Sequence, residues 1–228
     1  MKISQATVSL LQSFANINSN LLVKPGNKMA TRSAAGSAQA RATVEEDFPV
    51  QFAIYDLNQL LSLLSVSSDP EIDFGEKSMT IKSTTGGEIE YYYADASLIL
   101  APPESDPTLE SHFKFTLSNS DIQVIQKTAQ IVSATMLSVV SDGKTVFLKI
   151  NDPKNSTSNT YKKQLGASDE TFNVKVSMES FRGVVPDTYD VQIGHAIAKG
   201  NNKVLVFHLS STTRKLTYLI AADTTSKI

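Results

Sequence analysis

The hydrophobic pattern of the chain changes period within residues 48–66, FPVQFAIYDLNQLLSLLSV. Branched and aromatic residues dominate residues 50–55, which predicts a strand. Beyond Asp56 the apolar positions follow the helical period: Leu57, Leu60, Leu61 and Leu64. Asp56 and Gln59 have the spacing of a capping box. This stretch is therefore predicted to form a strand followed by a capped helix.

The same plan recurs in residues 171–186, TFNVKVSMESFRGVVP. Apolar residues alternate over its first half as in a strand, and Ser177 stands where a helix N-cap is expected. The apolar side of the short helix that follows is formed by Met178, Phe181, Val184 and Val185. Two copies of one plan predict two similar domains.

Further elements surround the first copy. Residues 2–17 have the pattern of an amphipathic helix, with an apolar side formed by Ile3, Ala6, Leu10, Phe14 and Ile17. Short strands are predicted at residues 21–23, 29–33, 38–44, 71–74, 79–83 and 88–94. Residues 101–108, APPESDPT, contain three of the eight prolines and predict a linker. We therefore expect an N-terminal domain of residues 1–104 and a C-terminal domain of residues 105–228.

The second half repeats the order of elements. Ser118 and Asp121 have capping-box spacing at the start of a helix predicted over residues 118–133. Strands are predicted at residues 112–117, 136–140, 145–150, 160–165, 189–193, 203–209 and 216–221, with a turn at Gly200-Asn201. The predicted fold class is α+β, with antiparallel sheet in both domains.

Composition excludes several classes of protein. The chain has 228 residues, no cysteine and a formal net charge of -2, so disulfide, thiolate and dense basic surface chemistry are not expected. No stretch is long and apolar enough to span a membrane, and the N-terminus lacks the apolar core of a signal peptide. These features predict a cytoplasmic protein without a membrane partner.

Candidate catalytic motifs have simpler explanations. Gly143-Lys144-Thr145 ends like a phosphate-binding loop, but the upstream glycine is missing and Asp142-Gly143 is typical of a hairpin turn. The three histidines have no partner at metal-ligand spacing, and no serine lies in a nucleophile elbow. We therefore expect no enzymatic activity, no metal site and no cofactor.

Four strings along the chain carry a resemblance to a known family. MKIS opens the chain, LLQSFANINSNLLVKPG and FAIYDLNQLLSLLS follow in the first 66 residues, and YLIAAD lies near the end. Together they resemble the DNA polymerase sliding clamps of T-even-type bacteriophages. The resemblance implies the DNA clamp fold, with two helices packed on antiparallel sheet in each domain and three subunits closed into a ring. It also implies double-stranded DNA, a polymerase C-terminal peptide and an ATP-dependent clamp loader as partners, in the cytoplasm of an infected bacterial host.

In such a ring the helices line the hole, and contacts with phosphates should be weak because base contacts would create stopping points. The polar residues expected to face DNA are Lys2, Gln5, Gln12, Lys24, Lys28, Arg32, Gln123, Lys127, Gln130 and Arg182. The family generally has more lysine on its first helix, so direct affinity for DNA should be low.

Ring closure in the family adds the last strand of one first domain to an edge strand of the next second domain. The corresponding stretches are residues 88–94 and 157–165, and the expected interface residues are Glu88, Glu90, Tyr92, Tyr161, Lys162 and Lys163. Their opposite charges fit a steered pairing of edges. They fit an ordinary charged edge strand equally well.

Partner peptides of the family enter an apolar pocket near the interdomain linker and the C-terminal strand. The candidates by position are Leu98, Ile99, Leu100, Leu219 and Ile220, each of which fits a core position as well. A second role in transcription is compatible with the resemblance. The alternatives are an accessory or structural phage protein that binds DNA without a ring, and a small α+β hydrolase, which lacks support in any nucleophile and base pattern.

Overall fold

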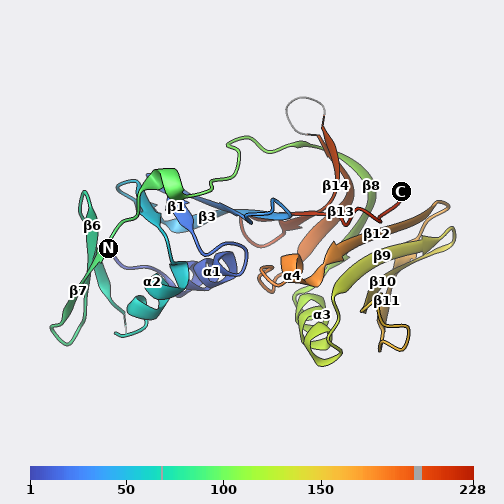
Figure 1. Cartoon of the computed structure of the whole chain (residues 1–228), viewed down its shortest axis with the longest axis horizontal. Coiled ribbons are helices and arrows are strands. Elements are labelled where there is room, and N and C mark those ends of the chain that lie inside the picture. Colours follow the sequence, from blue (N-terminus) through green and yellow to red (C-terminus); the bar gives the residue numbers. More distant parts are fainter. Residues whose placement is uncertain (68, 198–201) are drawn as a thin grey trace. The chain divides into compact units, whose positions relative to one another are not determined.

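A computed structural model describes residues 1–67, 69–197 and 202–228, so the turn expected at Gly200-Asn201 lies outside the described residues (Figure 1). The chain divides into two compact units. The first contains residues 1–35 and 39–102, and the second contains residues 36–38 and 103–228. The expected boundary between residues 104 and 105 stays a prediction, and each unit is described separately below.

The first unit contains two helices that contact each other and short antiparallel strands. Its elements are α1 (Gln5–Ala15), β1 (Leu21–Val23), β2 (Gly26–Arg32), β3 (Ala38–Phe48), β4 (Phe52–Ile54), α2 (Leu57–Leu64), β5 (Glu71–Phe74), β6 (Ser78–Lys82), β7 (Glu88–Tyr92) and the 3-10 turn η1 (Ala96–Leu98). Strand β1 pairs with β4, β2 pairs with β3, and β5, β6 and β7 form a three-stranded sheet in that order. Apart from η1, which the pattern did not predict, and shifts of a few residues at the ends, these are the elements that the hydrophobic pattern predicts.

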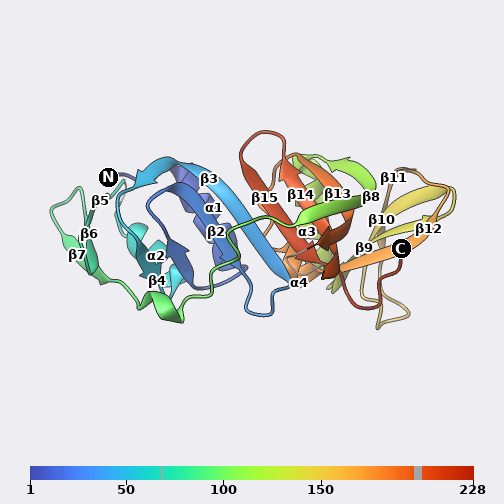
Figure 2. The same cartoon turned by 90° about the horizontal axis from the view of Figure 1, so that it is seen from above.

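The second unit is also built from helices and antiparallel strands. Its elements are β8 (Thr108–Leu117), α3 (Asn119–Ile131), β9 (Met136–Asp142), β10 (Thr145–Asn151), β11 (Tyr161–Ala167), β12 (Thr171–Ser177), α4 (Met178–Phe181), β13 (Tyr189–Ile197), β14 (Lys203–Ser211) and β15 (Leu216–Ala221). One sheet has the order β11-β10-β9-β12, and Figure 2 shows β15, β14, β13 and β8 side by side in the other. The hairpin expected at Asp142-Gly143 is confirmed, since it joins β9 to β10 and Gly143 has a φ of 84°.

Helices α2 and α3 begin directly after the polar residues that the sequence pattern predicts as caps. The Asp56 side chain accepts a hydrogen bond from the Gln59 backbone at the start of α2. At the start of α3, Ser118 and Asp121 form a complete capping box. Each cap satisfies backbone N–H groups that the first helical turn leaves without a partner. These local interactions explain why the helix starts can be identified from the sequence.

The buried side of α1 differs from the expected one. Thr7 and Ser13 are buried, whereas Ala6 is exposed. The reason is Glu46 of β3, a buried carboxylate that accepts hydrogen bonds from the Thr7 hydroxyl (2.6 Å) and the Ser4 backbone (2.5 Å). Burial raises the pKa of Glu46, but these hydrogen bonds outweigh burial and place the pKa below its ordinary value. A polar contact therefore turns α1 away from the orientation that apolar residues alone would favour.

The last helix is shorter than expected. It ends at Phe181 rather than continuing to Val185, and Arg182 is its C-cap. The segment that follows still buries Val184, and the Gln126 side chain of α3 donates a hydrogen bond to the Val184 carbonyl at 2.8 Å. Tertiary contacts thus hold an irregular segment where the apolar pattern suggested helix.

Candidate nucleic-acid interface and edge strands

The residues expected to face DNA from the first unit are all at least partly exposed. They are Lys2, Gln5, Gln12, Lys24, Lys28 and Arg32. The Lys2 ammonium forms an ion pair with Asp69, and the hydrogen bond and charge of that carboxylate raise the pKa of Lys2. Lys2 is therefore charged, but its charge is largely compensated within its own unit.

A depression of about 700 Å³ lies beside α1 and the end of α2 in the same unit. Its apolar lining residues are Ile3, Val8, Leu61, Leu64, Pro70 and Ile72. Its carboxylates, Glu45, Glu46 and Asp69, outnumber its one cation, Lys2. The charge balance here is negative, so this face has little attraction for phosphate.

Helix α3 presents a mixed outward face in the second unit. Gln123, Lys127 and Gln130 are exposed as expected, and so is Arg182 at the end of α4. Two apolar side chains that the sequence pattern did not identify lie among them: Val124 is 41% exposed and Ile131 is 83% exposed. The outward face of α3 therefore combines amides and one cation with apolar side chains.

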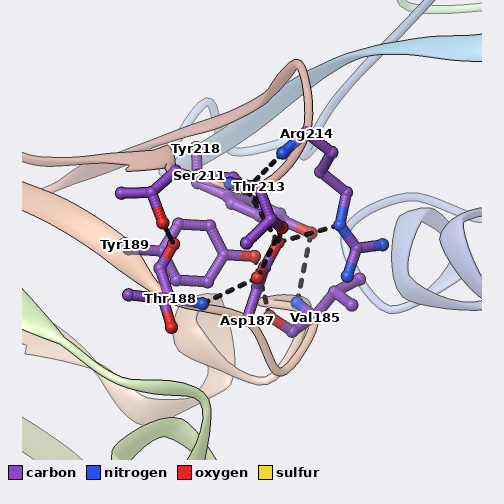
Figure 3. A network of polar contacts seen from close by, with 9 residues as sticks. Val185, Asp187, Thr188, Tyr189, Ser211, Thr213, Arg214 and Tyr218 are labelled. Atoms are coloured by element: carbon purple, nitrogen blue, oxygen red, sulfur yellow. Dashed lines mark hydrogen bonds and ion pairs between the residues drawn. The ribbon is translucent and has the colours of Figure 1, made fainter.

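A buried carboxylate, Asp187, which no sequence motif singled out, joins the segment before β13 to the turn between β14 and β15 (Figure 3). Asp187 accepts hydrogen bonds from the hydroxyls of Ser211 and Thr213, from the Thr188 backbone and from Arg214 Nε, all within 2.8 Å. Burial raises the pKa of Asp187, but the hydrogen bonds outweigh burial and place the pKa below its ordinary value. The cluster fixes the turn between β14 and β15 against the segment before β13.

Two tyrosines extend this cluster into the core of the second unit. Tyr189 donates a hydrogen bond to the Val185 carbonyl at 2.7 Å, and the Val185 backbone donates one to the Tyr218 hydroxyl at 3.2 Å. Burial raises the pKa of Tyr189. Both phenols are therefore held by hydrogen bonds as part of the structural framework.

Each unit has an open sheet edge formed by the strand expected at a subunit interface. Strand β7 pairs with β6 alone, and β11 pairs with β10 alone, among the described strands. The stretch expected as residues 157–165 is a strand only from Tyr161, because turns stabilised by Asn155 and Ser158 precede it.

The expected interface residues differ in how far they are free to contact another molecule. Glu88, Glu90, Tyr92 and Lys162 are exposed, and Tyr92 donates a hydrogen bond to Glu90 at 2.9 Å. Lys163 instead forms an ion pair with Asp121, the capping residue of α3, within its own unit. The two lysines are adjacent in sequence, but only one projects into solvent.

The candidate residues of the peptide pocket differ in solvent exposure. Leu98 and Leu100 are 64% and 44% exposed, whereas Ile99 is buried. In the second unit Leu219 is half-buried and Ile220 is 1% exposed. Leu98 and Leu100 can contact a peptide directly, whereas Ile99 and Ile220 are core residues.

No group of three or more histidine, aspartate or glutamate side chains is arranged to hold a metal ion in residues 1–67, 69–197 and 202–228. Over the same part of the chain, no helix is long and apolar enough to cross a membrane.

Comparison with known proteins gives matches over the whole chain. A family model described as DNA polymerase processivity factor matches residues 2–101. The sliding clamp of Vibrio phage KVP40 is 30% identical over 199 residues, covering 85% of this chain and 90% of the relative. That of Escherichia phage RB69 is 27% identical over 232 residues, covering 99% and 98%.

Solved structures at lower identity match the fold. Proliferating cellular nuclear antigen from Entamoeba histolytica has a TM-score of 0.66 at 14% identity and covers 95% of this chain and 94% of its own. The antigen from A. fulgidus, solved with the C-terminal region of FEN-1 bound, has a TM-score of 0.66 at 14% identity and covers 96% of each chain. These likenesses confirm the expected fold class, α+β with the antiparallel sheets of the DNA clamp fold.

Proposed function

This chain belongs to the sliding clamp family of bacteriophages, which are DNA polymerase processivity factors, and on that premise we propose that three copies close into a ring around duplex DNA. The ring tethers the replicative polymerase during processive synthesis. The role requires no catalytic step by this chain and no cofactor.

One observation supports the ring above all others: among the described strands, the open sheet edges β7 and β11 carry opposite charges. Strand β7 carries the exposed Glu88 and Glu90, and β11 carries the exposed Lys162. Because β7 and β11 belong to the same chain, addition of β7 to the β11 of the next copy is a head-to-tail contact. Three such contacts close the ring, and DNA is then retained by enclosure rather than by affinity.

The exposed helix residues suit a wall that slides along DNA. Amide side chains such as Gln123 and Gln130 make weak contacts with phosphate, and Lys127 and Arg182 supply a few positive charges. Val124 and Ile131 offer no hydrogen bonds to base edges. The negative charge balance beside α1 is compatible with this role because retention does not depend on attraction.

Partners reach the ring from outside the hole. A clamp loader opens the ring and hydrolyses ATP to do so. A C-terminal peptide of the polymerase binds the apolar surface at Leu98 and Leu100. The ring works in the cytoplasm of the infected host cell. A ring that slides after replication has begun is also suited to contact a transcribing polymerase as a mobile activator.

The experiment that tests the ring combines mass with DNA topology. Native mass spectrometry should give an assembly of about three times the subunit mass of 24.7 kDa. After loading with loader and ATP, the protein should stay on nicked circular DNA and be lost when the circle is cut. A protein that is monomeric at all working concentrations, or that stays on linear DNA with free ends, would contradict the ring and favour an accessory protein that binds DNA without enclosing it.

A further inference from the structure

The solvent face of the open edge in the first unit is acidic. In the β6–β7 register, Ile89 and Tyr91 lie opposite the buried Ile81 and Met79, so Glu88 and Glu90 share the other face with Tyr92. Lys82 lies opposite Glu88, but its ammonium forms an ion pair with Asp73 at 2.6 Å. The outermost charges on this face of β7 are therefore two carboxylates.

The solvent face of the open edge in the second unit is basic. In the β10–β11 register, Lys163 lies opposite the buried Leu148, whereas Lys162 lies opposite Lys149 on the other face. The Lys162 ammonium lies 3.6 Å from the centre of the Phe147 ring. In the described part of the chain, no carboxylate forms an ion pair with Lys149 or Lys162.

Two lysines directly opposite each other on neighbouring strands repel, because they bring like charges together without a counter-charge between them. The aromatic ring beneath Lys162 offsets part of this repulsion. A carboxylate on a strand added beyond β11 would offset more of it, since it would lie beside Lys162 on the same face.

We propose that Lys162, together with Lys149 behind it, is the electrostatic contact for Glu88 and Glu90 of the next copy of this chain, and that Lys163 takes no part in that contact. This inference rests on the proposed ring. Strands that join edge to edge continue one sheet, so their side chains keep to matching faces. The buried face of β7 must continue into the buried face of β11, because the reverse arrangement would expose Ile89 and Tyr91 and place the glutamates against the core.

The same reasoning gives Lys163 a different role. It lies on the core face of β11, and its ion pair with Asp121 ties the open edge to the capping box at the start of α3. Lys163 is a positioning residue for that helix, so its substitution should affect the folding of the second unit rather than the selection of the neighbouring subunit.

The experiment measures trimer dissociation of the full chain at low and high salt, by native mass spectrometry and sedimentation. Lys162→Glu should raise the dissociation constant of a subunit contact about threefold to tenfold at low salt, and the effect should shrink at high salt. Glu88→Lys or Glu90→Lys should act in the same direction. Lys144→Glu, in the exposed turn between β9 and β10, makes the same charge change away from the edge and should leave the constant unchanged.

The decisive variants are the double exchanges Glu88→Lys with Lys162→Glu and Glu90→Lys with Lys162→Glu. Each chain supplies both edges, so an exchange within one chain restores opposite charges at every contact. At least one double variant should recover the wild-type constant. If the wild-type protein forms trimers but Lys162→Glu behaves like Lys144→Glu, or if neither exchange restores the trimer, the assignment of Lys162 is wrong. If the wild-type protein forms no trimer, the proposed ring fails first and the assignment fails with it.

Discussion

Asp187 Oδ2 and Arg214 Nε lie 2.8 Å apart in an ion pair whose carboxylate is 7% exposed and whose guanidinium side chain is 40% exposed. The carboxylate is desolvated, and the hydroxyls of Ser211 and Thr213 complete its hydrogen bonding. A buried charge is stabilising only when its partners are present, so removing one of them exposes the full cost of burial. The pair therefore makes the β14–β15 turn sensitive to substitution.

Asp187→Asn should lower the free energy of unfolding of the second unit by about 2 to 4 kcal/mol. The amide retains the size of the side chain but loses the charge that four donors share. Denaturant unfolding measures the change in free energy, and hydrogen exchange of the backbone amides in β13 to β15 shows where the structure is destabilised. The exposed Asp190 on β13 provides the matched control, and Asp190→Asn should change stability by about 0.5 kcal/mol or less. Equal effects of the two substitutions would show that the hydrogen bonds of Asp187 do not stabilise the second unit.

Stability should fall as the solution is acidified. The folded pKa values of Asp187 and Glu46 lie below their ordinary values because hydrogen bonds to the ionised carboxylates outweigh burial. Such groups stabilise the fold above the unfolded pKa, at about 4, and the contribution is lost as pH falls toward the folded pKa. Urea unfolding at pH 7 and pH 4 should therefore show a smaller pH effect in Glu46→Gln than in the wild-type protein. Glu45→Gln, an exposed neighbour, should retain the wild-type pH effect.

Lys127→Glu combined with Arg182→Glu should weaken the direct binding of DNA by about tenfold and reduce its salt dependence, because two positive side chains on the proposed inner wall are reversed. Loading and processive synthesis should fall with it. Lys114→Glu, exposed on strand β8, is the control for a single charge reversal outside the two helices, to be compared with Lys127→Glu alone. Unchanged loading and synthesis by the double variant would show that α3 and α4 do not face DNA.

Leu98→Asp combined with Leu100→Asp should weaken binding of the polymerase peptide by about thirtyfold, the loss typical of a central apolar anchor. Both side chains are exposed, so the fold and the trimer should persist. Fluorescence anisotropy of a labelled C-terminal peptide measures the affinity. Val66→Asp, at a position that is 73% exposed, controls for a new charge on the first unit. Retained affinity in the double variant would place the peptide elsewhere.

Gly194→Ala should destabilise the second unit by about 3 kcal/mol. A Cβ atom at this position would lie 2.0 Å from the Glu110 carbonyl oxygen on β8, where the β8–β13 register shifts. Gly87→Ala is the control, because its nearest neighbour, the Ser83 Cβ atom, lies at 4.0 Å. Thermal unfolding of both variants tests the packing of β13 against β8, and equal melting temperatures would contradict it.

Much of the fold follows from interactions within a few residues. Asp56 and Ser118 cap helices through backbone groups three residues away, and the glycine at 143 turns a hairpin within its own strand pair. The period of apolar residues identified the strands for a similar reason, because alternation depends on nearest neighbours. The ends of the elements shifted where tertiary contacts replaced local ones, as at Val184.

The candidate site could be predicted only in part from local sequence patterns. Sequence alone placed Glu88, Glu90 and Lys162 on charged strands and Lys127 on the polar side of a helix, and these side chains are exposed. It assigned Lys163 the same role as Lys162, because adjacent residues of one charge are equivalent until the faces of the strand are known. The face is set by the pairing of β11 with β10.

The sequence by itself therefore determined the order of helices and strands, their caps and the family. Tertiary structure decided which donor each desolvated carboxylate binds. The hydrogen-bonded pairs are far apart in sequence: Glu46 and Thr7 by 39 positions, Asp121 and Lys163 by 42, and Asp187 and Arg214 by 27. The reason is physical. Local periodicity records which side of an element is apolar, but a desolvated carboxylate takes its donors from whichever segments the completed fold brings beside it.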